Sequence, residues 1–499
     1  MHMLDRVIAS VSPRWALRRA EARHALGLVA HYHAAAGGRR TKSWRPSAGD
    51  ADETARRRDR LAYVSRDMVR NSGLAVRARD VIVNNTVGDG IIPKLTGPSE
   101  TVQRQGEEIL RRHIDTTAID ADGRANLYGL QRLATASVVE SGEVLIRRVR
   151  RQNSDGLELP LQLQVVEADH IDASWFGRSA DGNEIRDGIE YDAMGRRVAY
   201  YLYDRHPGSA QGIHAIRNRL KSRRVPADQI LHIYRQDRPG QMRGVSWYAP
   251  IALNLQDLLD YDDAQLMRQK IAACFAAFRI SADGAPSLSG EKDDTPIPSS
   301  LSPGSILSLA PDEDVRFADP PGVEGYDEFT RGVIRRVAAG LGITYEALSG
   351  DLSRVNFSSA RMGRMEMDRN VSSWQWLMLV PQMCQPIGEW LLEAWMARSG
   401  NPAVARSRLE WVPPARIVVD PAREIPAMRE TVRAGFKSRQ QVIREFGFDP
   451  ETVQSEILQD NETADRDGMV FDTDPRRTSS AGLTQVRQAG SEFPAPDDE

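Results

Sequence analysis

The sequence predicts an α+β fold, because two kinds of hydrophobic periodicity occupy separate stretches of its 499 residues. Between residues 128 and 235, apolar and polar residues alternate in runs bounded by Asp-Gly, Pro and Met-Gly turns, which is typical of strands. After residue 244 the spacing changes to the repeat of amphipathic helices. A hydrophobic share of 41% and a charged share of 27% suit a globular chain with buried cores.

The N-terminal region predicts a linker followed by helices. A short helix is expected over 14–36, and the Gly, Pro and Arg residues of 37–58 favour an extended connection. Apolar residues then recur at helical spacing over 59–85. Gly73 predicts a break that divides this stretch into two helices.

Four runs with strand-like alternation follow. They are residues 144–151, 159–172, 188–204 and 230–235. Together with the helices before them, these runs predict one mixed domain over 59–245.

Two long helices are expected after this domain, on either side of a polar insertion. The first is predicted over 247–278, with Ser246 as its N-cap and an apolar stripe along one face. The second covers 324–341 and stops at Gly342. Two such helices around an insertion predict a rod with the insertion at its tip.

The insertion and the region after the second helix have their own signals. Residues 281–323 are rich in Ser, Pro, Asp and Gly, and one short strand is expected at 305–309. After a connector, a third helical stretch is expected from Ser358 or Ser359 to Trp395, interrupted at its two prolines.

Charge is uneven along the chain, although the net charge is only −3. Residues 1–70 hold 15 basic and 7 acidic side chains, whereas residues 449–499 hold 4 basic and 13 acidic ones. Both ends lack the apolar residues that would offset the entropy of ordering them. We therefore expect solvated or partner-binding arms at the two ends.

The sequence lacks the signatures of several functional classes. It contains no Gly-x-x-x-x-Gly-Lys-Ser/Thr loop, no Gly-x-Ser-x-Gly elbow and no His-Glu-x-x-His motif, which argues against an enzyme of those classes. The longest apolar run, 271–278, is far shorter than the ~18 residues of a membrane span. Cys274 and Cys384 are expected to be small buried hydrophobic residues. We predict no cofactor and no metal.

One cluster keeps an enzymatic alternative open. Glu167, Asp169, His170 and Asp172 alternate near the end of an expected strand, and such ligands can hold a divalent metal for nuclease chemistry. A polar strand end explains the same residues without catalysis. Metal-dependent DNA cleavage that is lost in Asp169→Asn would favour the enzyme.

A second set of acids lies on the first long helix. Asp257, Asp260 and Asp263 fall on one helical face at i, i+3, i+6 spacing. A solvated face is the simpler interpretation. If this helix lines a pore instead, the carboxylates would repel a phosphate backbone and keep DNA from adhering to the wall.

Several segments, taken in order, resemble phage portal proteins of the lambda family. They are residues 43–53, 65–91, the Val-Glu-Ala-Asp-His-Ile-Asp stretch, 188–208, 225–251 and 335–370. The last segment is the most specific, with Gly340-Leu341-Gly342 followed by Tyr345-Glu346 and by Asn356-Phe357-Ser358-Ser359. The resemblance extends over about residues 43–460.

The resemblance implies a structural protein rather than an enzyme. A portal of this family forms a dodecameric ring at one capsid vertex, where double-stranded DNA is packaged and ejected without sequence specificity. Its implied partners are the terminase large subunit, a head–tail connector and the major capsid or scaffold proteins. It would assemble in the host cytoplasm, end in the virion and need no membrane. Another head or tail connector ring would not explain two stem-like helices around an insertion.

The resemblance also implies an elongated subunit with eight segments. They are a basic arm and linker (1–58), an α+β wing (59–245), a first stem helix (246–280), a clip (281–323), a second stem helix (324–342), a tunnel loop (343–358), wing and crown helices (359–448) and a partly disordered acidic tail (449–499).

Two sets of residues are expected to face the DNA. Short polar side chains of the tunnel loop should let DNA slide, and Arg354 should make transient phosphate contacts. These loop residues are Asp351, Ser353, Arg354, Asn356 and Ser358. The stem should contribute Asp257, Asp260 and Asp263 to the channel wall.

Overall fold

The computed structural model of this chain divides into two units, Met1–Glu53 and Thr54–Glu499. It describes residues 14–15, 39, 42–53, 55–209, 221–274, 278–281, 313–316, 325–414, 421–446, 448, 450–471, 473–474 and 476. In the first unit, residues 44–50 have no regular secondary structure, as predicted for a linker. All named helices and strands below belong to the second unit.

The second unit mixes helices and strands, which confirms the predicted fold class. The α-helices are α3 (Ala55–Asn71), α4 (Gly73–Thr86), α5 (Glu100–Ile114), α6 (Leu127–Ser141), α8 (Ala252–Cys274), α9 (Tyr326–Leu341), α10 (Tyr345–Ser349), α11 (Phe357–Trp374), α12 (Gln385–Ser399), α13 (Pro421–Arg433), α14 (Arg439–Glu445) and α15 (Pro450–Asp467). The strands are β1 (Ile92–Thr96), β2 (Glu143–Arg150), β3 (Leu161–Glu167), β4 (Gly177–Arg178), β5 (Glu184–Arg186), β6 (Ile189–Tyr191), β7 (Arg197–Tyr203), β8 (Ser222–Pro226), β9 (Ile230–Tyr234), β10 (Phe278–Ser281), β11 (Glu313–Arg316) and β12 (Arg408–Val412).

The predicted break in the helical stretch 59–85 is confirmed, since α3 and α4 are separate helices. The linker ends earlier than residue 58, because α3 already begins at Ala55. Ser72 has extended backbone angles and its hydroxyl accepts a hydrogen bond from the amide of Ala75, so it is the N-cap of α4. Two further helices, α5 and α6, lie where no helix was predicted, and α6 falls at the start of the stretch that reads as strands.

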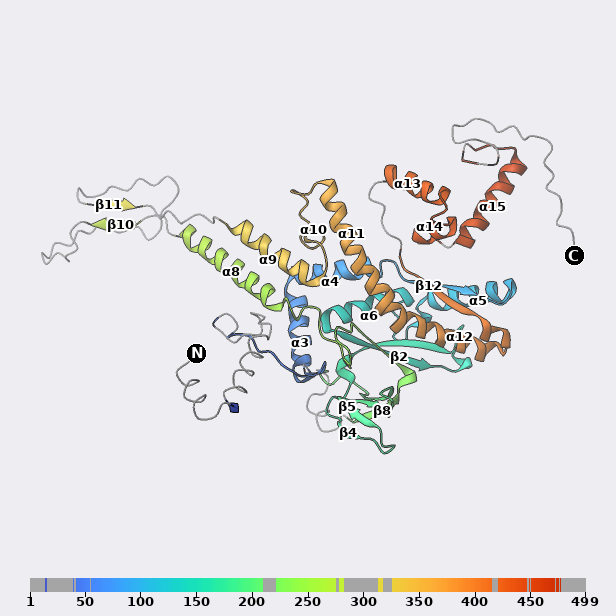
Figure 1. Cartoon of the computed structure of the whole chain (residues 1–499), viewed down its shortest axis with the longest axis horizontal. Coiled ribbons are helices and arrows are strands. Elements are labelled where there is room, and N and C mark those ends of the chain that lie inside the picture. The colour runs from blue at the N-terminus through green and yellow to red at the C-terminus, as the bar shows by residue number, and fades with distance from the viewer. Residues whose placement is uncertain are drawn as a thin grey trace, which may run out of the picture. The chain divides into compact units, whose positions relative to one another are not determined.

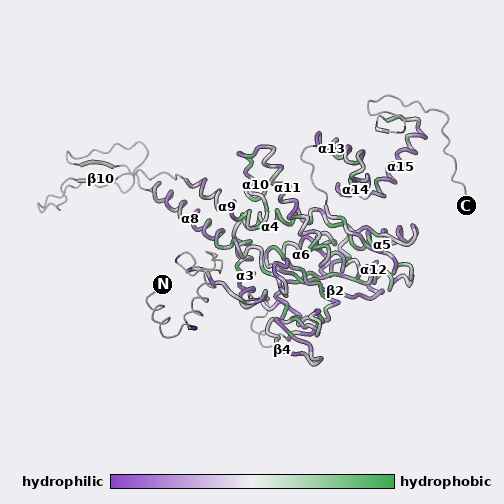
Figure 2. Tube along the Cα trace, in the orientation of Figure 1, coloured by the Kyte–Doolittle hydropathy of each residue, from purple (hydrophilic) through white to green (hydrophobic). Residues whose placement is uncertain are grey.

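The main core forms around α6 and a three-stranded antiparallel sheet in the order β3-β2-β9. The central strand β2 pairs Val144 with Glu167 of β3 and with Ile233 of β9. Figure 2 shows hydrophobic residues along α4 and α6, whereas α15 is largely hydrophilic. After α6 the chain turns at Gly142, whose φ of 96° and contact with the backbone of Val245 leave no room for a side chain.

A second sheet has five antiparallel strands in the order β4-β5-β6-β7-β8. It has a small core of its own, in which Tyr200 and Leu202 of β7 pack with Ile189 of β6 and Leu145 of β2. This sheet and the three-stranded sheet account for all four strand runs that were predicted from residue alternation.

The first long helix is shorter than predicted, and Ser246 is not its N-cap. Trp247 and Tyr248 are buried in the core, and the Tyr248 hydroxyl donates to the carbonyl of Ala75 at 2.6 Å. These anchors, with Pro250 after them, hold residues 246–251 in successive turns, so α8 starts only at Ala252.

The helices α8 and α9 lie side by side, and β10 and β11 pair beyond their far end (Figure 1). In α9, Val333 and Val337 are buried, and Gly342 ends the helix in the left-handed conformation, as predicted. The first turns of α8 bury Leu255 and Leu258, but residues 261–270 include no buried side chain. The strand expected at 305–309 lies outside the described residues.

The third helical stretch is continuous rather than interrupted at Pro381 and Pro386. It begins at Phe357, one residue earlier than predicted, and passes from α11 through the π-helix η5 (Gln375–Cys384) into α12. Pro381 lies inside η5, and Pro386 lies in the first turn of α12, yet the helical backbone continues past both residues.

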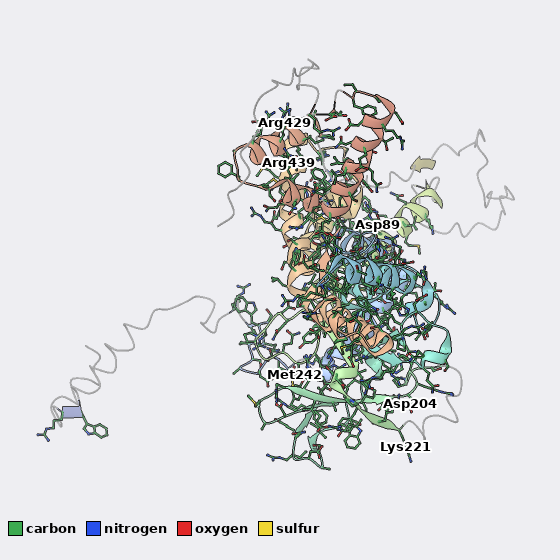
Figure 3. All side chains as sticks on the ribbon, turned by 90° about the vertical axis from the view of Figure 1, so that its right-hand side faces the viewer. Asp89, Asp204, Lys221, Met242, Arg429 and Arg439 are labelled. Carbon is green, nitrogen blue, oxygen red and sulfur yellow. The ribbon has the colours of Figure 1, made fainter. Side chains whose placement is uncertain are left out.

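The C-terminal helices add little to the core. Neither α13 nor α14 has a buried residue among those described; Arg429 and Arg439, labelled in Figure 3, belong to these two helices. The strand β12 returns to pair antiparallel with β1, with Leu409 opposite Leu95. No helix in the described part of the chain is both long and apolar enough to cross a membrane.

Candidate functional site

The three acids predicted to face a channel lie on α8, and all three are exposed. Asp260 accepts a hydrogen bond from the side-chain amide of Gln256 at 2.8 Å, and none of the three forms an ion pair among the described residues. Their charges are therefore presented to whatever lies next to this face of α8.

A neighbouring side of α8 packs against α9 through aromatic rings. Tyr261 stacks on Tyr326 with ring centroids 5.8 Å apart and lies 4.5 Å from the ring of Phe329. Asp262 accepts a hydrogen bond from the Tyr326 hydroxyl at 2.8 Å, and this bond raises the pKa of Tyr326. Asp262 thus serves the helix pair, which distinguishes it from the three outward-facing acids.

The loop between α10 and α11 is held by Asp351. Its carboxylate accepts hydrogen bonds from the hydroxyl and the amide of Ser353, at 2.6 and 3.0 Å, and from the hydroxyl of Tyr345 at 3.1 Å. These bonds, led by the one from the Ser353 side chain, lower the pKa of Asp351 to about 2. Asp351 and Ser353 therefore stabilise the conformation of the loop through their mutual hydrogen bonds.

The other loop residues differ in their environment. Asn356 is the N-cap of α11, because its side-chain oxygen accepts from the amide of Ser359 at 2.8 Å. Ser358 is exposed in the first turn of this helix. Arg354 is 69% exposed, and its guanidinium lies 3.9 Å from the carboxylate of Asp327. It is the loop cation best placed to reach a ligand in solvent.

The structure does not gather the four residues of the enzymatic alternative. The imidazole of His170 bonds the carbonyl of Tyr203 at 3.0 Å, and Asp172 accepts from the hydroxyls of Ser174 and Ser222. Glu167 and Asp169 are instead joined by His206, and one ligand atom from each of these three lies within 4.8 Å of the others. The geometry therefore does not favour the four-residue alternative, since the alternation is broken by the 3₁₀ turn Ala168–His170.

A basic side chain already offsets part of the charge of this acidic pair. The guanidinium of Arg66 lies 2.5 Å from Asp169 and 3.9 Å from Glu167. Burial raises the pKa of Asp169, but the hydrogen bond and the charge of Arg66 outweigh it and leave that pKa below its ordinary value. Arg66 therefore supplies the positive charge that a metal would otherwise bring.

A cluster of buried charges lies next to this region, and the sequence offered no sign of it. Glu143 is fully buried and accepts hydrogen bonds from Arg243 at 2.5 and 2.9 Å, from His232 at 2.9 Å and from the amide of Gly244 at 2.8 Å. Asp187 joins the network by pairing with Arg58. We call these five side chains the buried ion network: Arg58, Glu143, Asp187, His232 and Arg243.

The buried ion network shifts two pKa values strongly. Burial alone would raise the pKa of Glu143, yet Arg243, His232 and Arg58 together bring it well below its ordinary value. Burial lowers the pKa of His232 to about 4, so its imidazole is neutral at neutral pH. The partners come from far apart in the chain, and periodicity within one segment does not reveal them.

Comparison with known proteins decides the family. The family model described as "Phage portal protein, lambda family" matches residues 37–375. The chain belongs to this family. It is thus related to structural components of the bacteriophage virion, and the resemblance stated from the sequence is confirmed.

Individual phage portal proteins agree with this assignment. The chain is 27% identical to the "Probable portal protein" of Halomonas phage phiHAP-1, over 85% of this chain and 84% of that protein. It is 22% identical to "Portal protein B" of Escherichia phage lambda, over 78% of this chain and 80% of that protein. A chain from the solved "Virion of native gene transfer agent (GTA) particle" is 17% identical, with a TM-score of 0.47, over 82% of this chain and 96% of that one.

Proposed function

We propose that this portal family member forms a dodecameric ring at one capsid vertex, through which double-stranded DNA enters and leaves. The family match over residues 37–375 carries the proposal. A closed ring of identical subunits needs a surface on each subunit that fits a different surface on the next. The chain would act as a conduit and would have no catalytic role.

The arrangement of α8 and α9 supports a stem in this ring. Their aromatic contact fixes the two helices to one another, while residues 261–270 of α8 bury no side chain in the isolated subunit. In the proposal, 246–280 and 324–342 form the stem, and 281–323 form a clip that meets the terminase large subunit and the head–tail connector.

The remaining segments receive their roles by the same proposal. The α+β region 59–245 would be the wing that contacts capsid or scaffold proteins, and 359–448 would complete the wing and form the crown. The loop 343–358 would project to the DNA. The basic arm 1–58 and the acidic tail 449–499 would lie outside this framework.

The charges of the proposed channel suit a sliding polyanion. Exposed Asp257, Asp260 and Asp263 would repel phosphates from the stem wall, and no counterions would be released as they are when a basic protein binds DNA. The loop would add weak polar contacts through Ser353, Ser358 and the exposed Arg354. Assembly in the host cytoplasm and a final place in the virion complete the proposal.

Electron microscopy of the purified chain tests the ring directly. Negative-stain images should show closed rings with a central hole wide enough for duplex DNA. A chain that remains monomeric under all assembly conditions would contradict the proposal.

A charge reversal tests the channel wall. In Asp257→Lys/Asp260→Lys/Asp263→Lys, rings should form normally, but DNA packaging should slow or stall because lysines would bind the passing phosphates. The matched control reverses three exposed acids of α5, Glu100→Lys/Glu107→Lys/Glu108→Lys. Equal packaging rates in the two variants would contradict the assignment of α8 to the channel wall.

A further inference from the structure

A cavity of about 540 Å³ lies where the five-stranded sheet meets β9, the loop after it and η5. Strands β5, β6 and β7 contribute Arg186, Tyr191 and Arg197, β9 contributes Tyr234, and η5 contributes Gln382. Met242 on the loop, labelled in Figure 3, is a further wall residue. Among the described residues, this lining contains two guanidinium groups and no carboxylate.

Arg197 is a partly buried cation without an acidic partner in the described part of the chain. Its Nη2 donates to the Tyr234 hydroxyl at 2.5 Å and to the Met242 carbonyl at 3.2 Å. Its guanidinium also lies 5.4 Å from the centre of the Tyr234 ring. These neutral groups solvate the charge but do not neutralise it, and burying an uncompensated charge is costly.

The other polar groups of the cavity are also suited to an anion. Arg186 lies 5.1 Å from the centre of the Tyr191 ring and keeps a 3.4 Å contact with Glu184, in which both side chains are partly exposed. The hydroxyl of Tyr191 is buried and faces the guanidinium of Arg197, which can only donate to it, so its O–H has no acceptor among the described residues. At neutral pH, His232 in the wall carries no charge, and the charge of Glu143 behind it is already shared with Arg243.

We propose that this cavity binds a small oxyanion, whose negative charge is carried by a phosphate or a carboxylate group. Arg197 would supply the main charge, with Arg186 at its side, and the Tyr191 hydroxyl would donate a hydrogen bond. A guanidinium presents paired N–H groups that match the oxygens of either group. The bound anion would connect the five-stranded sheet to β9 and η5, and this role does not depend on the ring proposal.

Titration calorimetry of the full chain with inorganic phosphate and with citrate, at matched ionic strength with chloride as the blank, tests the site. At least one of the two anions should bind at a single saturable site. Saturation by phosphate alone identifies a phosphate site, and saturation by citrate alone identifies a carboxylate site. Saturation by neither overturns the proposal.

Variants locate the binding in this cavity. Tyr191→Phe keeps the ring and removes only the donor, so it should fold with an unchanged unfolding temperature and bind about tenfold more weakly. Arg197→Gln should abolish binding, and if it fails to fold, Tyr191→Phe and Arg186→Gln decide the result. Arg196→Gln is the matched control, since Arg196 is exposed and pairs with Asp192. Binding that is unchanged in Tyr191→Phe and Arg186→Gln would overturn the site.

Discussion

The buried ion network and the acidic face of α8 use the same kinds of side chain in opposite ways. In the network, the carboxylate of Glu143 is fully buried, and each of its oxygens is bonded to a donor from another part of the chain. On α8, Asp257, Asp260 and Asp263 are exposed and form no ion pair with the described residues.

The contrast separates charges that maintain the fold from charges that are free to meet a partner. A buried carboxylate surrounded by its own donors cannot be removed without leaving those donors uncompensated. Replacing an exposed carboxylate changes the stability of the chain little, because water solvates the carboxylate in both the folded and the unfolded state. Changes in the first set should therefore alter stability, and changes in the second should alter interactions with DNA.

The largest effect is expected when the network loses its central charge. Glu143→Gln should lower the free energy of unfolding by about 3–5 kcal/mol, because Arg243 and Arg58 would remain buried with only the charge of Asp187 between them. Urea denaturation measures this change as a shift of the midpoint at constant slope. Glu108→Gln is the control, since Glu108 pairs with Arg112 on the surface of α5 and should contribute less than about 0.5 kcal/mol. If Glu143→Gln lowers the free energy of unfolding no more than this control does, the buried ion network does not maintain the fold.

Acid should weaken the same network. His232 has its folded pKa lowered from 6.5 to about 4, so its contribution to stability is complete above about pH 6.5 and is lost as pH falls toward 4. The pKa of Glu143 is also lowered, so its contribution is lost in the same direction, below its ordinary value of 4.5.

Denaturation midpoints at pH 7 and pH 5 measure this dependence. The native chain should unfold at lower urea concentration at pH 5, and His232→Gln should show a smaller difference between the two pH values. Buried His113 has a lowered pKa as well, so part of the dependence should persist in that variant. Identical pH dependence in the two proteins would show that His232 does not titrate on unfolding.

A smaller effect on stability is expected in the predicted tunnel loop, which contains both a residue that maintains the fold and exposed residues that are free to contact a partner. Asn356→Ala should cost about 1 kcal/mol, because α11 loses its N-cap, whereas Asn356→Asp should retain most of the stability. Ser358 is exposed and lies two residues after Asn356, so Ser358→Ala should leave the unfolding temperature unchanged. If the two alanine variants have the same stability but both alter packaging, Asn356 acts on DNA rather than on the helix.

Much of the fold follows from local patterns. Alternation located the three strands β2, β3 and β9 of one sheet, but only β6 and β7 of the five-stranded sheet. Gly73 marked the start of α4, and Gly342 marked the end of α9. The prediction failed where tertiary contacts override local signals. The buried face of α6 includes the polar Gln131 and Thr135, while Leu133 is exposed, so hydrophobicity does not mark that face in the sequence. The core contacts of Trp247 and Tyr248 delay the start of α8.

The candidate sites were predictable to different degrees. The outward acids of α8 follow from helical spacing alone, because spacing fixes which residues share a face. Arg66 and His206 could not be assigned to Glu167 and Asp169, since only the folded chain brings them together. The same holds for Arg197, whose lack of an acidic partner is a property of the surrounding tertiary structure.

The π-helix η5 affects how this chain can tolerate changes in length. Within α12, removing one residue would turn everything after it by about 100° and expose Trp390 or Trp395. A π turn already contains one residue more than an α turn, so a deletion between Gln375 and Cys384 can restore ordinary helix while the flanking faces keep their orientation. Insertions and deletions among relatives should therefore be accommodated in η5 and avoided in α12.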